Sequence, residues 1–317
     1  MRRIVASVLL LSVLLAGCGV AVENTTPPPG VRATPCGTFS IAVNAWVGYE
    51  ANVAVVSYLA KNRLGCTVVE KDLTEEESWK ALAAGEIDTI LENWGHDDYK
   101  KDYIDRQRVA VEHGITGNKG IIGWYVPPWM AEEHPDIKDW KNLNKYAETM
   151  KTAQSGDKGQ LLDGDPSYVT NDEALVANLQ LNYKVVYAGS EDALIQAFKQ
   201  AQATRKPMVG YFYEPQWLFS EIRLVNVSLP AYKPGCDADA KTVKCGYQTY
   251  DLDKIANREF AMSGSPAATL VKNFKWTNND QNEVARAIAV GGKSRDEAAK
   301  AWLDSHPDIV KEWLAGT

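Results

Sequence analysis

Short apolar runs alternate with stretches of helical spacing in the first third of the chain. The apolar runs have the length and the Val and Ile content of buried strands. They are predicted as strands at 39–46, 66–73 and 87–93. One helix is predicted over 51–65, because Gly65 is typical of the position after a helix. A second is predicted from Thr74 to Gly85, because Glu77 completes a capping box with Thr74. This strand–helix order is typical of a parallel sheet.

The same alternation begins again after an apolar run that ends at Pro127 and Pro128. Further strands are predicted at 158–163, 183–188 and 206–212. Further helices are predicted at 170–181 and 190–203, and in the tail at 278–292 and 294–305, before a short terminal helix. We expect Thr170 or Asn171 to cap the first of these helices and Ser190 to cap the second.

The length of the chain after its N-terminal segment limits the domain organisation. About 280 residues are enough for two α/β lobes or for one large domain. The order of the predicted elements favours two lobes, because the chain builds one α/β unit, builds a second and then returns. We expect 38–127 and 231–317 to form the first lobe of a clamp and 128–230 to form the second.

The N-terminal segment predicts export and a lipid anchor. Two arginines precede an apolar run over 4–15 that is too short for a permanent membrane span. The run ends in Leu-Ala-Gly-Cys at Cys18, which resembles a bacterial lipobox; an ordinary secretory signal with a chance cysteine is the alternative. We therefore predict a signal peptide over 1–17, lipidation at Cys18 and a Pro- and Thr-rich tether over 18–37. The predicted location is extracytoplasmic, at the cell membrane.

The acidic balance of the chain excludes one class of partner. The 317 residues have a formal net charge of −7. Removal of the signal peptide takes away two arginines and no acid, which brings the charge to about −9. Nucleic-acid binding needs a basic footprint, so we expect no nucleic-acid partner. The four histidines show no metal-ligand spacing and no Cys-x-x-Cys occurs, so we expect neither a metal site nor a cofactor.

Four cysteines follow Cys18, and an even number outside the cytoplasm predicts two disulfides. Three pairings exist for four cysteines. The simplest joins Cys236 to Cys245 across a polar loop. It also joins Cys36 to Cys66, which would tie the start of the folded body to its second strand.

Aromatic residues gather where four of the predicted strands end. They are Trp46 and Tyr49 after the first strand, Trp94 and Tyr99 with His96 after the third, Tyr168 before a helix cap, and Tyr211, Tyr213 and Trp217 in the stretch GYFYEPQW. Open parallel sheets bind ligands at the carboxyl ends of their strands. We therefore expect the two lobes to present these rings to one another across a cleft. Alternation along the strand places Tyr211 and Tyr213 on one face and Phe212 on the other, in the core.

A quaternary ammonium group fits such a set of rings. It has no hydrogen-bond donor, whereas each Trp or Tyr face contributes roughly 0.5–2 kcal/mol to its binding. Any single ring is more often part of a core than a ligand contact. A ligand carboxylate needs donors, which the helix start at Val169 and Thr170 and the imidazole of His96 would supply. Acids near the expected site would instead complement the positive end of a ligand; they are Glu50, Glu92, Asp97, Asp98 and Glu214.

Together these features resemble the glycine betaine and proline betaine substrate-binding proteins of ABC importers. The segment LVKNFKWTNNDQNEVARAI and the later AAKAWLDSHPDIVKEWL are similar to the end of that family. The resemblance implies a non-catalytic α/β protein with a two-lobed, periplasmic-binding-protein-like clamp of type II. Such a protein captures a quaternary ammonium compatible solute in an aromatic cage and delivers it to the permease of an ABC importer. We expect this chain to act as a monomer.

The resemblance also assigns individual residues. Trp94 matches the ring after the third strand, and His96 lies near a donor for the ligand carboxylate. Tyr168 stands where the family commonly has a tryptophan, beside a backbone carboxylate site that corresponds to Val169 and Thr170.

Two further positions follow from the same resemblance. Tyr211 or Tyr213 matches the ring of a Gly-Trp pair in the family. This sequence has tyrosine there and a slightly longer loop, so either tyrosine fits. Trp46 and Tyr49 lie in a loop that contacts the ligand in some relatives.

Other functions stay open at this point. A choline- or carnitine-type binding protein would use the same rings. Choline, which has a full positive charge and no carboxylate, would be helped more by an acid in the cage. An extracytoplasmic enzyme would need a carboxylate pair such as Glu92 and Glu214, because no Gly-x-Ser-x-Gly occurs and no cysteine is free if both disulfides form. A sensory module on a similar fold would need a membrane receptor as its partner.

Overall fold

The computed structural model describes residues 36–168, 170–239 and 241–317. The predicted signal peptide, the predicted lipidation site at Cys18 and most of the predicted tether lie outside these residues. The described residues belong to one compact unit. Within the described ranges, no helix is both long enough and apolar enough to pass through a bilayer.

Three parallel strands begin the fold, as the apolar pattern predicts. They are β1 (Thr38–Val43), β2 (Thr67–Asp72) and β3 (Thr89–Asn93), with β1 between the other two. The helices between them are α1 (Val47–Leu64) and α2 (Glu75–Ala83). α2 begins with the predicted capping box, in which the side chains of Thr74 and Glu77 each accept a hydrogen bond from the other residue's backbone N–H.

One long strand runs through the middle of the sheet. The strands involved are β4 (Ala110–Val126), β7 (Val209–Glu214), β8 (Val225–Val227) and β9 (Thr249–Asn257). The first part of β4 pairs with β9 and its last part pairs with β7 and β8, all antiparallel. The sequence pattern shows an apolar run at the end of β4 without predicting a strand there, and it does not predict β9. Buried Asp253 and Lys254 interrupt the apolar pattern of β9, and the Lys254 ammonium donates to the carbonyl oxygens of Lys272 and Phe274.

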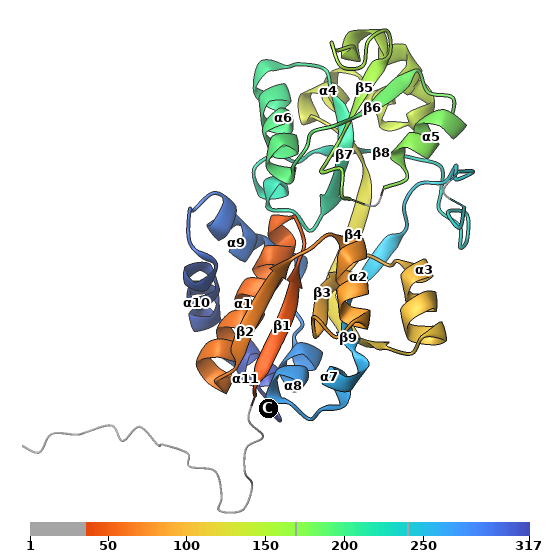
Figure 1. Cartoon of the computed structure of the whole chain (residues 1–317). Helices are drawn as coiled ribbons and strands as arrows, with labels where there is room; N and C mark the ends of the chain where they lie inside the picture. Colours follow the sequence, from red (N-terminus) through yellow and green to blue (C-terminus); the bar gives the residue numbers. More distant parts are fainter. Residues whose placement is uncertain (1–35, 169, 240) are drawn as a thin grey trace, which may run out of the picture. The chain divides into compact units, whose positions relative to one another are not determined.

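The second group of strands continues the same sheet. β5 (Gly159–Asp163) pairs in parallel with β6 (Tyr183–Tyr187) on one side and with β7 on the other. The helices here are α5 (Asp172–Asn178) and α6 (Glu191–Thr204). Ser190 caps α6 as predicted, because its hydroxyl accepts the backbone N–H of Ala193 at 3.2 Å. The full strand order is β2-β1-β3-β9-β4-β7-β5-β6, with β8 beside β4 (Figure 1).

Short helices fill the connections and a helical layer closes the chain. The helices in the connections are α3 (Asp97–Tyr99), a π-helical segment (Lys100–Arg106), α4 (Pro128–Glu133), and 3₁₀ segments at Pro135–Lys138, Trp140–Tyr146, Glu148–Met150 and Trp217–Ser220. The closing helices are α7 (Arg258–Met262), α8 (Pro266–Asn273), α9 (Asn278–Ala289), α10 (Arg295–Ser305) and α11 (Pro307–Trp313). α1 packs against α8, α9 and α10.

We call the part around β1, β2, β3 and β9 the first lobe and the part around β5, β6, β7 and β8 the second lobe. β4 belongs to both. In Figure 1 the first lobe is the lower part of the fold and the second lobe is the upper part.

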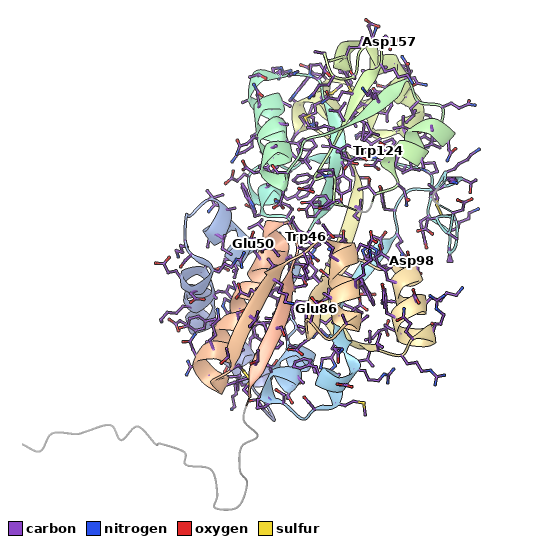
Figure 2. The ribbon with its side chains drawn as sticks, in the orientation of Figure 1. Trp46, Glu50, Glu86, Asp98, Trp124 and Asp157 are labelled. Atoms are coloured by element: carbon purple, nitrogen blue, oxygen red, sulfur yellow. A yellow bond between two sulfur atoms is a disulfide. The ribbon has the colours of Figure 1, made fainter. Side chains whose placement is uncertain are left out.

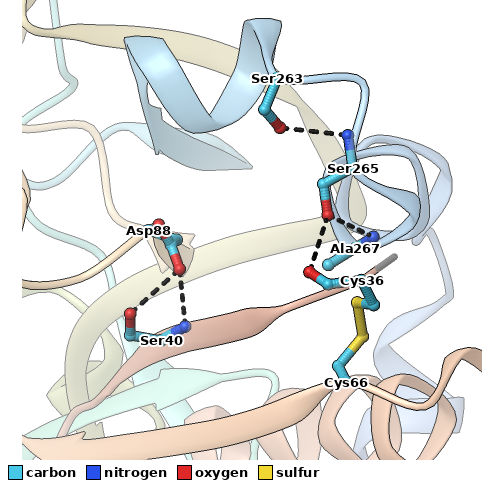
Figure 3. Close-up of a disulfide and its surroundings, with 7 residues drawn as sticks. All are labelled: Cys36, Ser40, Cys66, Asp88, Ser263, Ser265 and Ala267. Carbon is cyan, nitrogen blue, oxygen red and sulfur yellow. Dashed lines mark hydrogen bonds between the residues drawn. A yellow bond between two sulfur atoms is a disulfide. The ribbon is translucent and has the colours of Figure 1, made fainter. Parts of the chain in front are cut away.

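The two disulfides have the simplest predicted pairing. Cys36 is bonded to Cys66, and Cys236 is bonded to Cys245. The first ties the residues before β1 to those before β2 (Figure 3). The second closes a loop that lies against α5, because the side-chain amide of Asn178 donates to two carbonyl oxygens of this loop at 2.9 Å each. The chain segment before β9 therefore contacts the second lobe.

Candidate ligand-binding cavity

One cavity of about 420 Å³, which includes its open mouth, brings most of the predicted strand-end rings together. This volume is typical of a site for a small molecule. The cavity is lined by Trp46, Glu75, Trp94, His96, Ile122, Tyr168, Tyr211, Tyr213 and Tyr250. Trp46 lies at the end of α1 that faces the second lobe (Figure 2). Both lobes therefore contribute walls to this cavity.

The rings meet mainly edge to face across the two lobes. Trp46 contacts Tyr168 with ring centroids 5.8 Å apart and planes at 87°. Trp94 contacts Tyr213 with centroids 5.8 Å apart and planes at 86°. The ring centroid of Tyr168 lies 6.2 Å from that of Tyr211 and 6.3 Å from that of Tyr213. Such a continuous set of faces and edges surrounds a space that suits a bulky, weakly hydrated cation.

β7 separates the two roles that alternation predicts for its side chains. Tyr211 and Tyr213 both line the cavity, while Phe212 points away and is fully buried in the core. The choice between the two tyrosines therefore disappears, since the structure brings both to the cavity. Trp217, which follows in the next turn, is also buried and packs beneath the ammonium group of Lys199.

Two of the described residues that were predicted for the site, Tyr49 and Thr170, do not line this cavity. Tyr49 is fully buried in the first turn of α1, and its hydroxyl oxygen accepts the backbone N–H of Leu91 at 3.0 Å. The hydroxyl of Thr170 donates to Asp163 at 3.0 Å. Val169 lies outside the described residues. The next backbone N–H, that of Asn171, already donates to the hydroxyl of Tyr247 at 2.9 Å.

Glu92 holds the two tryptophans that line the cavity. It is buried at the end of β3, and one carboxylate oxygen accepts the indole N–H groups of Trp46 and Trp94, both at 2.9 Å. The other oxygen accepts the side-chain amides of Gln281, at 2.7 Å, and of Asn52. Burial raises the pKa of Glu92, and these four hydrogen bonds oppose that rise. Glu92 thus orients two cavity rings, and both of its oxygens accept hydrogen bonds.

Glu191 connects the second lobe to the first. It is the first residue of α6, and one of its carboxylate oxygens accepts the backbone N–H of Val47 at the start of α1, 2.8 Å away. The other oxygen accepts the hydroxyl of the cavity residue Tyr213 and the side-chain amide of Gln216. Burial raises the pKa of Glu191 above its usual value, and these hydrogen bonds offset only part of that rise. A helix N-terminus is a favourable place for a carboxylate, so this contact draws the two lobes together.

The sequence reasoning missed three lining residues: Glu75, Ile122 and Tyr250. Glu75 is the first residue of α2, and its carboxylate lies 2.5 Å from the imidazole Nε2 of His96. Its place after the end of β2 was the available signal, because strand ends form the ligand edge of a parallel sheet. Tyr250 belongs to β9, the strand that the pattern does not predict. Gly95 lets it approach: a Cβ there would lie 2.9 Å from its ring, and the backbone φ is 93°.

Comparisons with known proteins agree with this geometry. Residues 37–305 match the OpuAC family, described as the substrate binding domain of the ABC-type glycine betaine transport system. The chain is also similar to the glycine betaine/carnitine transport binding protein GbuC of Listeria monocytogenes serotype 1/2a (strain 10403S), with 26% identity over 127 residues. That match covers 40% of this chain and 38% of the relative, well under two thirds of its length.

Two solved structures share the fold at low sequence identity. One is lactococcal OpuAC in a closed-liganded conformation with glycine betaine, with a TM-score of 0.68, 20% identity, and coverage of 88% of this chain and 99% of that chain. The other is an ABC-transporter choline binding protein in complex with choline, with a TM-score of 0.73, 19% identity, and coverage of 89% and 93%. The two-lobed α/β fold predicted from the sequence is thereby confirmed. Because the family match extends over most of the chain, this protein belongs to the family of substrate-binding domains of ABC-type glycine betaine transport systems.

Proposed function

We propose that this protein captures a quaternary ammonium solute such as glycine betaine in the aromatic cavity and delivers it to an ABC permease. The observation that carries the proposal is the convergence of six Trp and Tyr side chains from both lobes on one small space. Each ring face contributes roughly 0.5–2 kcal/mol. Several faces together supply about 8 kcal/mol, which corresponds to micromolar affinity.

A ligand panel tests this proposal. Calorimetric titration of the purified protein with glycine betaine, proline betaine, choline, carnitine and ergothioneine is expected to give saturable binding for at least one of them. Binding should also quench or shift tryptophan fluorescence, because Trp46 and Trp94 line the cavity. Absence of saturation with every compound would show that the proposed ligand class is wrong.

Replacing Trp94 with alanine is expected to weaken ligand binding at least tenfold, since the cavity loses its ring next to Tyr213. Trp94→Phe keeps an aromatic face and should lose less affinity. The matched control is Trp140→Ala, because Trp140 packs against the core of the second lobe and does not line the cavity. Calorimetry measures all four proteins. A Trp94→Ala variant with unchanged affinity would remove this ring from the binding site.

Location and assembly belong to the same proposal. Substrate-binding proteins of ABC importers act outside the cytoplasm, and we propose that Cys18 carries the lipid that anchors this one to the membrane. We propose that the protein acts as a monomer. We also propose that it is not catalytic, which is supported by the hydrogen bonds that give the Glu92 carboxylate an orienting role. For the lobes we propose that the first boundary lies between residues 127 and 128, as predicted. The second boundary differs from the prediction, because we propose that the chain returns to the first lobe at β9 and not at residue 231. The contacts of the Cys236–Cys245 loop with α5 support that change.

A further inference from the structure

The cavity wall contains one pair of charged groups among its rings. Of the nine lining residues in the described part of the chain, Glu75 and His96 carry the carboxylate and the imidazole, and no lysine or arginine is among the nine. The imidazole Nε2 and a carboxylate oxygen of Glu75 lie 2.5 Å apart. The two side chains are only 10% and 12% exposed, so solvent screens their charges weakly.

Local structure holds both partners in place. Glu75 is the first residue of α2, and the N-terminus of a helix favours a carboxylate. His96 follows the end of β3 in a left-handed backbone conformation with a φ of 48°, and its ring packs against that of Tyr99. The pair is therefore a fixed part of the wall, formed by elements that follow β2 and β3.

We propose that the Glu75–His96 pair determines which charge class of quaternary ammonium ligand the cavity prefers. When His96 is protonated the pair is neutral overall, which favours a zwitterion that carries a carboxylate. When His96 is neutral the pair has a net charge of −1, which repels a ligand carboxylate and favours a ligand that is only a cation. This inference rests on the proposed function, because it concerns the same cavity.

The surroundings of His96 set the direction of its titration. Burial lowers the pKa of His96, but the hydrogen bond and charge of Glu75, together with the charges of Asp98 and Asp253, outweigh burial and raise the pKa above 6.5. Asp253 lies on β9, and its carboxylate is paired with the ammonium group of Lys100 at 2.6 Å. Below this pKa the pair is neutral, and above it the pair is negative. The preference should therefore shift from the zwitterion to the cation as pH rises.

Glycine betaine and choline are the probes that isolate this effect. Both carry a trimethylammonium group, and only glycine betaine carries a carboxylate. Neither probe changes its charge over the pH range of the experiment, about 5.5 to 9. Burial raises the pKa of another acid, Asp172 in the second lobe, to about 8. Taking the ratio of the two dissociation constants cancels changes that affect both ligands equally, such as a general loosening of the second lobe.

The experiment measures the dissociation constants of both ligands by calorimetry across this pH range. For the unmodified protein, the ratio of the glycine betaine constant to the choline constant is expected to rise about tenfold with pH. In Glu75→Gln the ratio should be about tenfold lower than in the unmodified protein at the upper end of this pH range, where the unmodified pair has a charge of −1 and the variant, with a neutral imidazole, has none. Glu76→Gln is the matched control, since Glu76 belongs to the same helix but pairs with exposed Lys80 and does not line the cavity. It should behave as the unmodified protein.

His96→Asn removes the titrating group and keeps a residue that tolerates the left-handed backbone. Its ratio should not change with pH. Binding of both ligands by the unmodified protein with a pH-independent ratio would overturn this inference and leave the proposed function intact. A ratio that rises as steeply in His96→Asn would overturn it as well, because another group would then be responsible. Absence of saturation with either ligand at every pH would overturn the proposed function, and this inference with it.

Discussion

Replacing Glu92 with leucine is expected to weaken ligand binding about a hundredfold, because two rings of the cavity lose the acceptor that orients them. Leucine has a similar volume and no oxygen. The indole N–H groups of Trp46 and Trp94 and the amides of Asn52 and Gln281 would then all lack this partner. Each buried donor without an acceptor costs about 1–3 kcal/mol, so the free energy of unfolding should also fall. Calorimetry and denaturant unfolding measure the two effects.

Glu92→Gln is the informative comparison for this prediction. The buried side-chain oxygens of Asn52 and Gln281 have no hydrogen-bond partner among the described residues. Rotation of these two amides would present their oxygens to the new glutamine NH₂, while its oxygen still accepts both indoles. This variant should therefore keep the ring geometry and lose only the negative charge behind the rings. A leucine variant that binds as tightly as the unmodified protein would contradict the role assigned to Glu92.

Replacing Glu191 with alanine is expected to accelerate ligand dissociation at least tenfold and to change association little. The variant removes the acceptor of the Val47 N–H in the first lobe and of the Tyr213 hydroxyl in the cavity wall. Hydrogen bonds to charged groups contribute about 1.5–3 kcal/mol, and the bond from the Val47 N–H joins the two lobes. Affinity differences among variants of one site mostly appear in the dissociation rate. Stopped-flow fluorescence with the tryptophans of the cavity measures both rates.

The control for this prediction lies on the same helix. Asp192→Ala also removes an acid from the first turn of α6, but Asp192 is exposed and its carboxylate accepts a hydrogen bond from the side-chain amide of Gln196 on the same helix. It should therefore change helix stability without changing dissociation. If Glu191→Ala released the ligand as slowly as the unmodified protein, the contact between the lobes would have no part in holding the ligand.

The predictable part of the site follows from two regularities of strands. Ligands bind at the carboxyl ends of parallel strands, and this rule alone points to Trp46 and Trp94. Alternation along β7 separates Tyr211 and Tyr213 from Phe212. Both regularities depend only on the local periodicity of the sequence, which also predicts β1, β2, β3 and the two capped helices α2 and α6.

The unpredicted part depends on interactions that are distant in sequence. Tyr49 was expected in a loop, but α1 begins at Val47 without a side-chain cap, so this residue lies in the helix and points into the core. An acid at the position of Glu75 is already explained by the first turn of α2, which favours carboxylates. The sequence therefore gives no separate sign that Glu75 lines the cavity. Tyr250 lies in β9, which also contains buried Lys254. Burial of this ammonium group is tolerated only because it donates hydrogen bonds to carbonyl oxygens about twenty residues further along the chain.

β4 has a mechanical consequence. A single hydrogen-bonded sheet continues through it from one lobe to the other, so any change in the angle between the lobes is also a change in the twist of this strand. The register of β4 against β9 is irregular at two places, near Gly114 and Gly117, where the ladder is interrupted. Interrupted ladders bend and twist more readily than regular ones. We therefore expect the first half of β4 to be the more compliant part of this connection, so that its stiffness contributes to the free energy of any movement of the lobes around a ligand.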